Sequence, residues 1–356
     1  MDLNDRRIAS TAALLRRREP DFEQFLKVLK RQGVPEHLPA YEHIASDHFI
    51  GEVTGTEFHK IPQSDPAYWE VYTRFWLSLG FDGIPIEIPL NVRLAKAEEL
   101  ASHGSEAQAV IRSEEDLERY PWPSETEPID FRPYEIVADL MPRGARLVAG
   151  VCMGPYEWVS TMMGVKGLSL ALFRQPELVE QMFDRIGSLI VSGVRQLATM
   201  DAVGALRQGD DLGFKTATFL RPELLRRLVI PWYAKMAQIA HDAGKPFVLH
   251  SCGNLGEIYE DLITAGVDAK HSFEETILPV EDFKQQYGER VTALGGLDVD
   301  LICRGDEEEI RTYTRRKVES CYGDGHWAFG TGNSLTDYMS PVNYLLAADE
   351  ALQLTS

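Results

Sequence analysis

The chain has 356 residues and a formal net charge of −19, with 44% hydrophobic and 26% charged residues. These proportions are typical of a soluble globular protein, and the length suits one large α/β barrel domain over residues 1–356. The acidic charge argues against nucleic acid or an anionic membrane as a partner. The four cysteines lack framework spacing, and neither a secretory signal nor a run of about 20 apolar residues occurs, so we expect a cytoplasmic protein.

Two parts of the chain fall outside the pattern expected for a barrel. The first 80 residues show mostly helical spacing and predict an N-terminal helical extension. The stretch Ser113–Pro133, rich in Glu and Pro, is expected to form an exposed excursion. The helices predicted in the extension are Asp5–Arg18, Asp21–Gln32 and Ala67–Leu79.

From residue 83 onward, short apolar runs alternate with helical stretches, which predicts a parallel sheet covered by helices. No Gly-x-Gly-x-x-Gly follows a strand, and polar residues recur at the carboxyl ends of the strands. The sequence therefore favours a (β/α)8 TIM barrel over an open dinucleotide-binding sheet. The strands that can be located are Gly83–Ile88, Arg146–Val151, Val203–Leu206, Phe247–Leu249, Val267–Lys270, Val291–Leu294 and Trp327–Phe329.

The stretch Lys245–Leu255 carries the strongest chemical signal. Its apolar strand runs into His250, Ser251 and Cys252, and alternation along a strand places His250 and Cys252 on one side. An imidazole and a thiol at a strand end supply half of a tetrahedral zinc site. The same pair could instead position a polar substrate, or be satisfied core residues.

Neighbouring strand ends supply further polar side chains, which in a barrel all face one mouth. Of the adjacent Asp210 and Asp211, we expect one to cap a helix and the other to act as a general acid/base or hydrogen-bond acceptor. A further zinc ligand could be His271, Glu274 or one of these two aspartates, with Glu274 also a candidate catalytic carboxylate. The residues expected to contact the substrate are Asp298, Asn333, Ser334 and Phe273.

Taken together, these residues resemble the uroporphyrinogen decarboxylase superfamily, and within it the branch that is similar to cobalamin-dependent methyltransferases. The resemblance covers the chain from about residue 150 to the end. It rests on Gly209-Asp-Asp-Leu-Gly213, Pro231-Trp-Tyr233, Gly244-Lys-Pro-Phe-Val-Leu-His-Ser-Cys-Gly253, Asp268-Ala-Lys-His-Ser-Phe-Glu274, Leu294-Gly-Gly-Leu-Asp298 and Gly330-Thr-Gly-Asn-Ser334.

The resemblance implies a (β/α)8 barrel with an N-terminal helical extension, and zinc bound by a His-x-Cys pair and a later cysteine. His250 and Cys252 match the pair, whereas the loop Gly330–Ser334 contains no cysteine. Either another residue, such as His271 or Glu274, completes the site, or the metal has been lost. The resemblance also implies a monomer or homodimer, and a corrinoid carried by a separate protein.

Three hypotheses about function follow. The first is zinc-assisted transfer of a methyl group between a small O- or N-methylated substrate, or folate, and a corrinoid protein. The second is a metal-free decarboxylase of the uroporphyrinogen type, in which Asp210 or Asp211 holds ring nitrogens. The arginine-rich N-terminal motif of that enzyme is not found here. The third is a non-catalytic barrel that binds a corrinoid protein or a small ligand.

Overall fold

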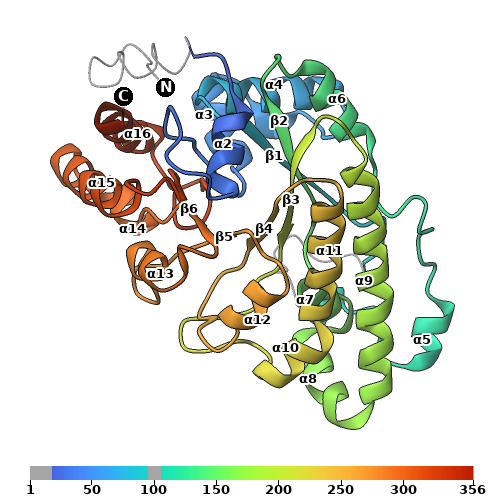
Figure 1. Ribbon diagram of the computed structural model, residues 1–356. Coiled ribbons are helices and arrows are strands. Elements are labelled where there is room, and N and C mark those ends of the chain that lie inside the picture. The colour runs from blue at the N-terminus through green and yellow to red at the C-terminus, as the bar shows by residue number, and fades with distance from the viewer. Residues whose placement is uncertain (1–17, 95–105, 356) are drawn as a thin grey trace.

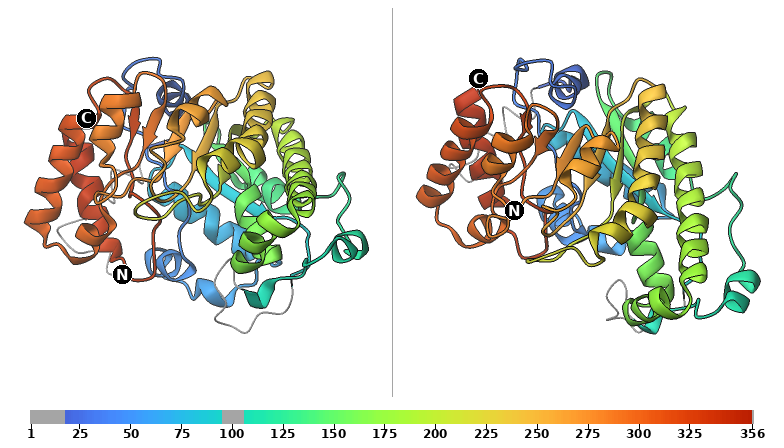
Figure 2. Two further views of the ribbon diagram at one scale, coloured as in Figure 1. Left: turned by 90° about the horizontal axis from the view of Figure 1, so that it is seen from below. Right: turned by 60° about the horizontal axis from the view of Figure 1, so that its bottom comes forward.

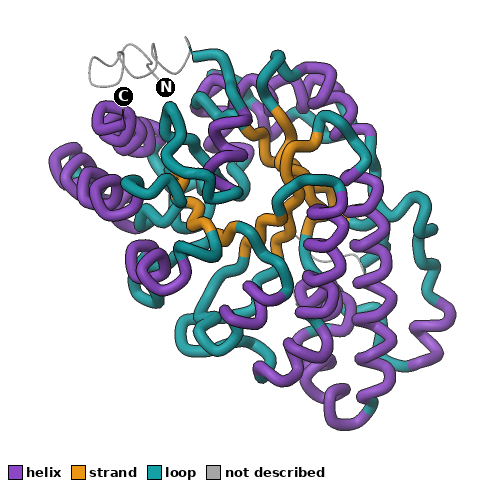
Figure 3. Tube along the Cα trace, in the orientation of Figure 1, coloured by secondary structure: helices purple, strands orange, loops and turns teal. Residues whose placement is uncertain are grey.

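The computed structural model describes residues 18–94 and 106–355, and its centre is a parallel sheet of seven strands in the order β1-β2-β3-β4-β5-β6-β7. The sheet curves, and helices cover its outer face (Figures 1 and 3). Each strand predicted from the sequence is present. The strands are β1 (Gly83–Pro89), β2 (Arg146–Cys152), β3 (Val203–Gly209), β4 (Phe247–His250), β5 (Ala269–His271), β6 (Thr292–Leu294) and β7 (Trp327–Ala328).

Helices follow the strands in the alternation expected from the sequence, and the α/β barrel class is confirmed. The predicted helix Asp5–Arg18 lies almost entirely outside the described residues. The helices are α2 (Phe22–Leu29), α3 (Asp47–Thr54), α4 (Pro66–Ser78), α5 (Glu114–Arg119), α6 (Arg132–Leu140), α7 (Pro155–Met163), α8 (Val165–Arg174), α9 (Pro176–Ala198), α10 (Pro222–Leu228), α11 (Ile230–Asp242), α12 (Tyr259–Thr264), α13 (Val280–Tyr287), α14 (Val299–Arg304), α15 (Glu307–Cys321) and α16 (Pro341–Thr355), with 3₁₀ turns η1 (Phe58–Lys60) and η2 (Glu106–Gln108).

Helix α5 stands away from the other helices, as the sequence predicts for the segment Ser113–Pro133. It contains no buried residue, and its N-cap Ser113 accepts a hydrogen bond from Asp116 N. Figure 2 shows this helix in teal at the margin of the chain in both views. Among the helices of the described ranges, none is both long enough and apolar enough to cross a membrane.

The two faces of the sheet carry different side chains, because successive residues of a strand point to opposite faces. In β2, Leu147, Ala149 and Val151 pack with the outer helices, whereas Val148 belongs to a separate inner cluster. Helix α2 contributes Phe22, Phe25, Val28 and Leu29 to that inner cluster. The apolar face of α2 thus packs on the inner face of the sheet, whereas the polar site lies at the carboxyl ends of the strands.

The eighth strand of a closed barrel is absent from the part of the chain that the structure describes. Residues 40–45 lie beside β7 instead and form isolated parallel bridges, Ala40 to Phe329 and Ala45 to Leu335. The segment carries Glu42 and His43 into the buried interior.

Glu42 joins this segment to the loop after β7, and it is fully buried. Its carboxyl oxygens accept hydrogen bonds from Thr331 N at 2.7 Å and Thr331 Oγ1 at 2.6 Å. Burial nevertheless raises the pKa of Glu42 from 4.5 to about 8. The carboxyl group is therefore protonated in the folded chain at neutral pH.

Glu42→Gln is expected to reduce the pH dependence of stability. Between about pH 4.5 and pH 8, folded Glu42 keeps a proton that the unfolded chain has lost, so its contribution to stability falls as pH rises. The loss is at most about 1.4 kcal/mol per pH unit. Urea denaturation of both proteins across this range measures it. Parallel curves for the wild type and Glu42→Gln would contradict the assignment of the proton to Glu42.

Candidate active site

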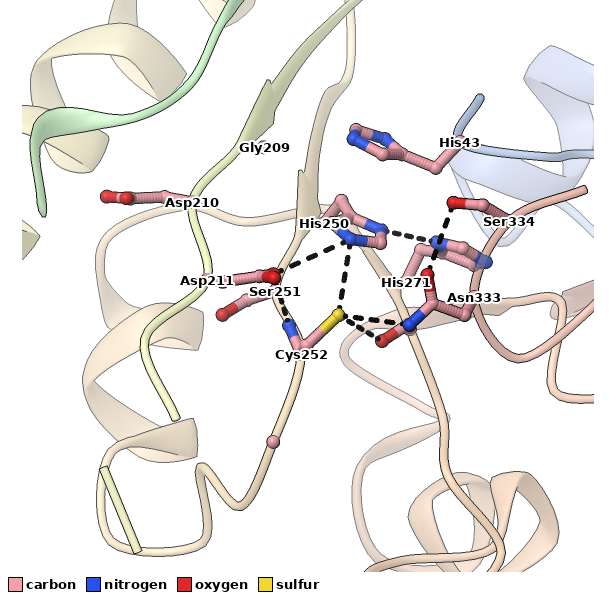
Figure 4. A network of polar contacts seen from close by, with 12 residues as sticks. His43, Gly209, Asp210, Asp211, His250, Ser251, Cys252, His271, Asn333 and Ser334 are labelled. Carbon is pink, nitrogen blue, oxygen red and sulfur yellow. Dashed lines mark hydrogen bonds and ion pairs between the residues drawn. The ribbon is translucent and has the colours of Figure 1, made fainter. Parts of the chain in front are cut away.

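Polar side chains meet at the carboxyl ends of β3, β4 and β5, on the inner face of the sheet (Figure 4). The parallel register pairs Gly209 with His250 and His250 with His271. Cys252 follows His250 by two residues, and its Sγ lies 3.5 Å from His250 Nε2. The period of a strand therefore brings the imidazole and the thiol together, in the arrangement that the sequence suggests.

Asp211 completes a group of three possible metal ligands. Its Oδ1 lies 3.7 Å from His250 Nε2 and accepts a hydrogen bond from Cys252 N at 2.9 Å. Ligand atoms of Asp211, His250 and Cys252 all lie within 4.8 Å of one another. We call these residues the His250–Cys252–Asp211 cluster.

Zinc fits this donor set. Thiolate, imidazole and carboxylate are its usual ligands, at about 2.0–2.3 Å, so two ligands of a tetrahedral ion lie roughly 3.3–3.8 Å apart. The separations of 3.5 Å and 3.7 Å from His250 Nε2 fall in that range. Three protein ligands would leave a fourth position of a tetrahedral zinc ion for water or substrate, as in catalytic zinc sites.

His271 lies behind His250 rather than among the ligands, because both of its ring nitrogens are engaged. Its Nε2 is 3.0 Å from Thr331 O, and its Nδ1 is 2.7 Å from His250 Nδ1. A carbonyl only accepts, so His271 Nε2 carries the hydrogen, and burial lowers the pKa of His271 to about 3. Neutral His271 then accepts at Nδ1, and His250 Nδ1 must donate. This corrects the expectation that His271 is itself a ligand.

The tautomer of His250 follows from this chain of hydrogen bonds. With its hydrogen on Nδ1, neutral His250 presents the lone pair of Nε2 to Cys252 and Asp211. Burial, together with the positive charges of Arg207 and Lys270, lowers the pKa of His250 well below its usual value, which keeps the ring neutral. A hydrogen-bonded partner behind a ligating histidine is the usual way in which proteins orient such a ligand.

The imidazole ring of His43 packs against one face of the His250 ring. The two rings are stacked, with centroids 3.7 Å apart and planes 9° from parallel. His43 comes from the segment beside β7, and it is buried. No sequence pattern indicates a role for His43, because it lies in no strand and in none of the recognised motifs.

Arg207 and Glu87 form a largely buried ion pair beneath the cluster, and no sequence pattern indicates this pairing. Arg207 Nη2 contacts Glu87 Oε2, and Arg207 Nη1 donates to His43 O at 2.6 Å. The Arg207 side chain is 1% exposed. The pair thus anchors the backbone of the residue that stacks on His250.

Asp210 points away from the cluster and caps a helix (Figure 4). Its carboxyl oxygens accept hydrogen bonds from Tyr156 N, Glu157 N and Tyr233 Oη at 3.1, 2.9 and 2.6 Å. The sequence predicts that one aspartate of the pair caps a helix, and the structure assigns this role to Asp210. The capped helix is α7, which precedes β3, rather than the helix that follows. Fully buried Asp210 is thus turned away from the position of a general acid/base in the mouth.

Three predicted residues surround the thiol and its turn. Asn333 Nδ2 donates to Cys252 Sγ at 3.3 Å, so Asn333 occupies the side on which the family resemblance places a third cysteine. Ser334 Oγ donates to Asn333 Oδ1 at 3.2 Å. Glu274 Oε1 accepts from Gly253 N at 3.3 Å, and it supports the turn after Cys252 without joining the cluster.

The remaining two predicted residues line a neighbouring open cleft of about 340 Å³, together with Glu274 and Asn333. Phe273 is buried, and its backbone N donates to Gly332 O at 2.9 Å. Asp298 is the N-cap of α14, and its Oδ1 accepts from Leu301 N at 2.9 Å. Helix capping accounts for the carboxylate of Asp298, whereas substrate contact by either residue stays a prediction.

The surroundings of Cys252 favour the protonated thiol. Burial, followed by the charge of Asp211, raises the pKa of Cys252 to about 12. A bound metal cation would displace that proton, because zinc coordinates the thiolate.

Below the cluster, Lys270 is buried, and its Nζ donates to Ser251 O at 3.4 Å and to Ser272 O.

Comparison with known proteins places the chain in a family. The model of the family described as uroporphyrinogen decarboxylase (URO-D) matches residues 90–350. The chain belongs to the URO-D family. The match covers every residue of the His250–Cys252–Asp211 cluster and begins after His43 and Glu87. No curated protein matches the chain.

Among solved structures, a methyltransferase from Methanosarcina mazei is similar over 95% of this chain and 99% of its own, with 18% identity and a TM-score of 0.68. This similarity shows that the two proteins share the URO-D barrel fold. A dihydropteroate synthase from Xanthomonas albilineans (16% identity, 50% and 58% covered, TM-score 0.26) is more distant. So is an intracellular xylanase from Thermoanaerobacterium saccharolyticum (9% identity, 91% of both chains, TM-score 0.39).

Proposed function

We propose that the chain is a zinc-assisted methyltransferase that moves a methyl group between a small O- or N-methylated substrate, or folate, and a corrinoid carried by a separate protein. The observation that carries this proposal is the meeting of His250 Nε2, Cys252 Sγ and Asp211 Oδ1 at the barrel mouth. Membership of the URO-D family and the fold shared with a methyltransferase support it.

In this proposal some residues of the site would bind zinc, and others position those ligands. His250, Cys252 and Asp211 would hold zinc, which when bound supplies a Lewis acid that polarises the methyl-bearing heteroatom. His271 fixes the tautomer of His250 through the 2.7 Å contact, and His43 restrains its ring from the opposite face. Asn333, at 3.3 Å, limits the rotation of the Cys252 thiol. The side chains of the site are therefore positioned before any substrate arrives.

Decarboxylation of the uroporphyrinogen type is the second candidate, favoured by the description of the matching family. Its substrate carries several carboxylates, which require cationic partners. Asp211 and Glu274 at the mouth are acidic, and the buried Arg207 already pairs with Glu87. A polycarboxylate would thus meet repulsion at this mouth, which places methyl transfer first.

The test combines metal content with activity. Protein purified from zinc-replete cells without chelator is expected to contain about one zinc per chain. Methylated donors are then screened with reduced cobalamin, and the absorbance of methylcobalamin is followed. Activity should disappear on chelation and return with zinc. Methyl transfer that persists in metal-free protein would contradict the role of zinc. Porphyrinogen decarboxylation without methyl transfer would contradict the proposed reaction.

A further inference from the structure

The loop after β7, residues 330–334, packs directly against the segment of residues 40–45. Tyr41 N donates a hydrogen bond to Phe329 O at 2.8 Å, just before this loop. A Cβ atom at Gly330 would lie only 1.9 Å from Tyr41 O, so the two backbones can approach this closely because the residue is glycine. The loop and the segment are thus in close contact, and a side chain of one can determine the position of the other.

Glu42 makes the polar connection between the two. Its carboxyl oxygens accept hydrogen bonds from Thr331 N at 2.7 Å and from Thr331 Oγ1 at 2.6 Å, and Glu42 is fully buried. A buried polar group that loses its partner is not compensated by water, so these hydrogen bonds are costly to break. One carboxyl group therefore holds both the main-chain amide and the side chain of Thr331, which restricts the rotation of this residue.

The carbonyl group of Thr331 continues the network toward the cluster. It accepts the hydrogen of His271 Nε2 at 3.0 Å, and His271 Nδ1 lies 2.7 Å from His250 Nδ1. These contacts place the hydrogen of His250 on Nδ1 and leave Nε2 as the ligand atom. A displacement of the Thr331 carbonyl would therefore change the orientation of His271 and, through it, that of His250.

The same loop also contacts the thiol of the cluster. Asn333 Nδ2 donates to Cys252 Sγ at 3.3 Å. Figure 4 shows Asn333 and His271 on the same side of the cluster. The loop thus supports an imidazole and a thiol at once, and Glu42 is the buried side chain that holds the loop.

We infer that Glu42 is a positioning residue for His250 and Cys252. It acts through the loop after β7, because its carboxyl group fixes Thr331 and the loop then orients both ligands. Removal of partners that orient metal ligands commonly lowers metal affinity about 10–100-fold. Glu42 precedes residues 90–350, which the URO-D model matches, so this support comes from outside the matched part of the chain. The inference rests on the metal site of the proposed function.

Glu42→Leu is expected to weaken zinc binding by at least about tenfold, because leucine keeps an apolar side chain in place but accepts no hydrogen bond. Glu42→Gln should restore the affinity to within about threefold of the wild type, since its amide can accept from Thr331 N and donate to Thr331 Oγ1. Competition with a chromogenic chelator measures these affinities. The absorption spectrum of the Co²⁺-substituted protein reports the arrangement of the ligands, and it should change in Glu42→Leu but not in Glu42→Gln.

Glu350→Leu is the matched control, because Glu350 is also a buried glutamate but pairs with Arg311 and Arg315 of α15. It should bind zinc like the wild type. Thr331→Val removes one of the two hydrogen bonds to Glu42, and it should weaken zinc binding by about threefold. Wild-type affinity in folded Glu42→Leu, or in Thr331→Val if Glu42→Leu does not fold, would overturn the inference. An equal loss of affinity in Glu350→Leu would overturn it as well.

A measurement without metal separates this inference from the proposed function. In metal-free protein with isotopically labelled histidine, NMR detects ring N–H groups that hydrogen bonds protect from exchange, and His250→Ala and His271→Ala assign them. Glu42→Leu should lose or shift the signals of His250 Nδ1 and His271 Nε2, whereas Glu42→Gln should keep them. A wild type that binds no zinc but shows this difference would contradict the proposed function alone. Zinc binding by the wild type, with unchanged ring signals in Glu42→Leu, would contradict the inference alone.

Discussion

Replacing Cys252 by serine is expected to abolish tight zinc binding and to lower methyl transfer by more than about 100-fold. Loss of a residue that only orients a metal ligand commonly costs about 10–100-fold, and Cys252 is itself a proposed ligand. Serine keeps the size of the side chain and the hydrogen bond from Cys252 N to Asp211, so the fold should persist. Metal analysis after gel filtration and the methylcobalamin assay measure the two effects.

Cys303→Ser provides the matched control, because Cys303 is a partly buried thiol on α14 outside the cluster. It should bind zinc and transfer methyl groups like the wild type. His250→Ala should resemble Cys252→Ser in both measurements. If Cys252→Ser keeps its zinc and its activity, the His250–Cys252–Asp211 cluster is not the metal site, and the proposed mechanism fails.

The part of the site that follows local rules could be predicted from the sequence. His250 and Cys252 converge because a strand has a period of two, and that period needs no tertiary information. The positions of all seven strands follow from the alternation of apolar runs with helices. The family resemblance rests on motifs from about residue 150 onward, and the match of the URO-D family model over residues 90–350 confirms it.

The residues that hold this pair in place depend on contacts between distant segments. His43 stacks on His250 across 207 positions of the chain (250 minus 43), from a segment that shows no strand pattern. Asp210 and Asp211 have the same local context, and only the packing of α7 assigns the cap to Asp210. The third predicted strand ends at Leu206, whereas β3 continues to Gly209. A charged residue such as Arg207 is unusual in a buried strand, and Glu87, the partner that makes its burial possible, lies 120 residues away in the sequence.

Arg207→Met is expected to destabilise the fold by about 3–5 kcal/mol. The Arg207 side chain is 1% exposed and that of Glu87 is 12% exposed, and removal of one member leaves the other charge buried without its partner. The carbonyl of His43 also loses its donor. Urea denaturation measures the change. Arg304→Met is the control, since the ion pair of Arg304 with Asp300 is highly exposed and should contribute less than about 1 kcal/mol.

The double variant Glu87→Gln/Arg207→Met tests whether the loss of stability in Arg207→Met comes from the unpaired charge of Glu87. Replacement of both members of a buried ion pair by uncharged groups is often nearly neutral, because no charge remains to be hydrated. The double variant should therefore be more stable than Arg207→Met alone, although it contains one more substitution. Glu87→Gln alone is measured as well. If the losses of stability in Glu87→Gln and Arg207→Met add up to the loss in the double variant, Arg207 stabilises the barrel by packing, and its ion pair with Glu87 contributes nothing measurable.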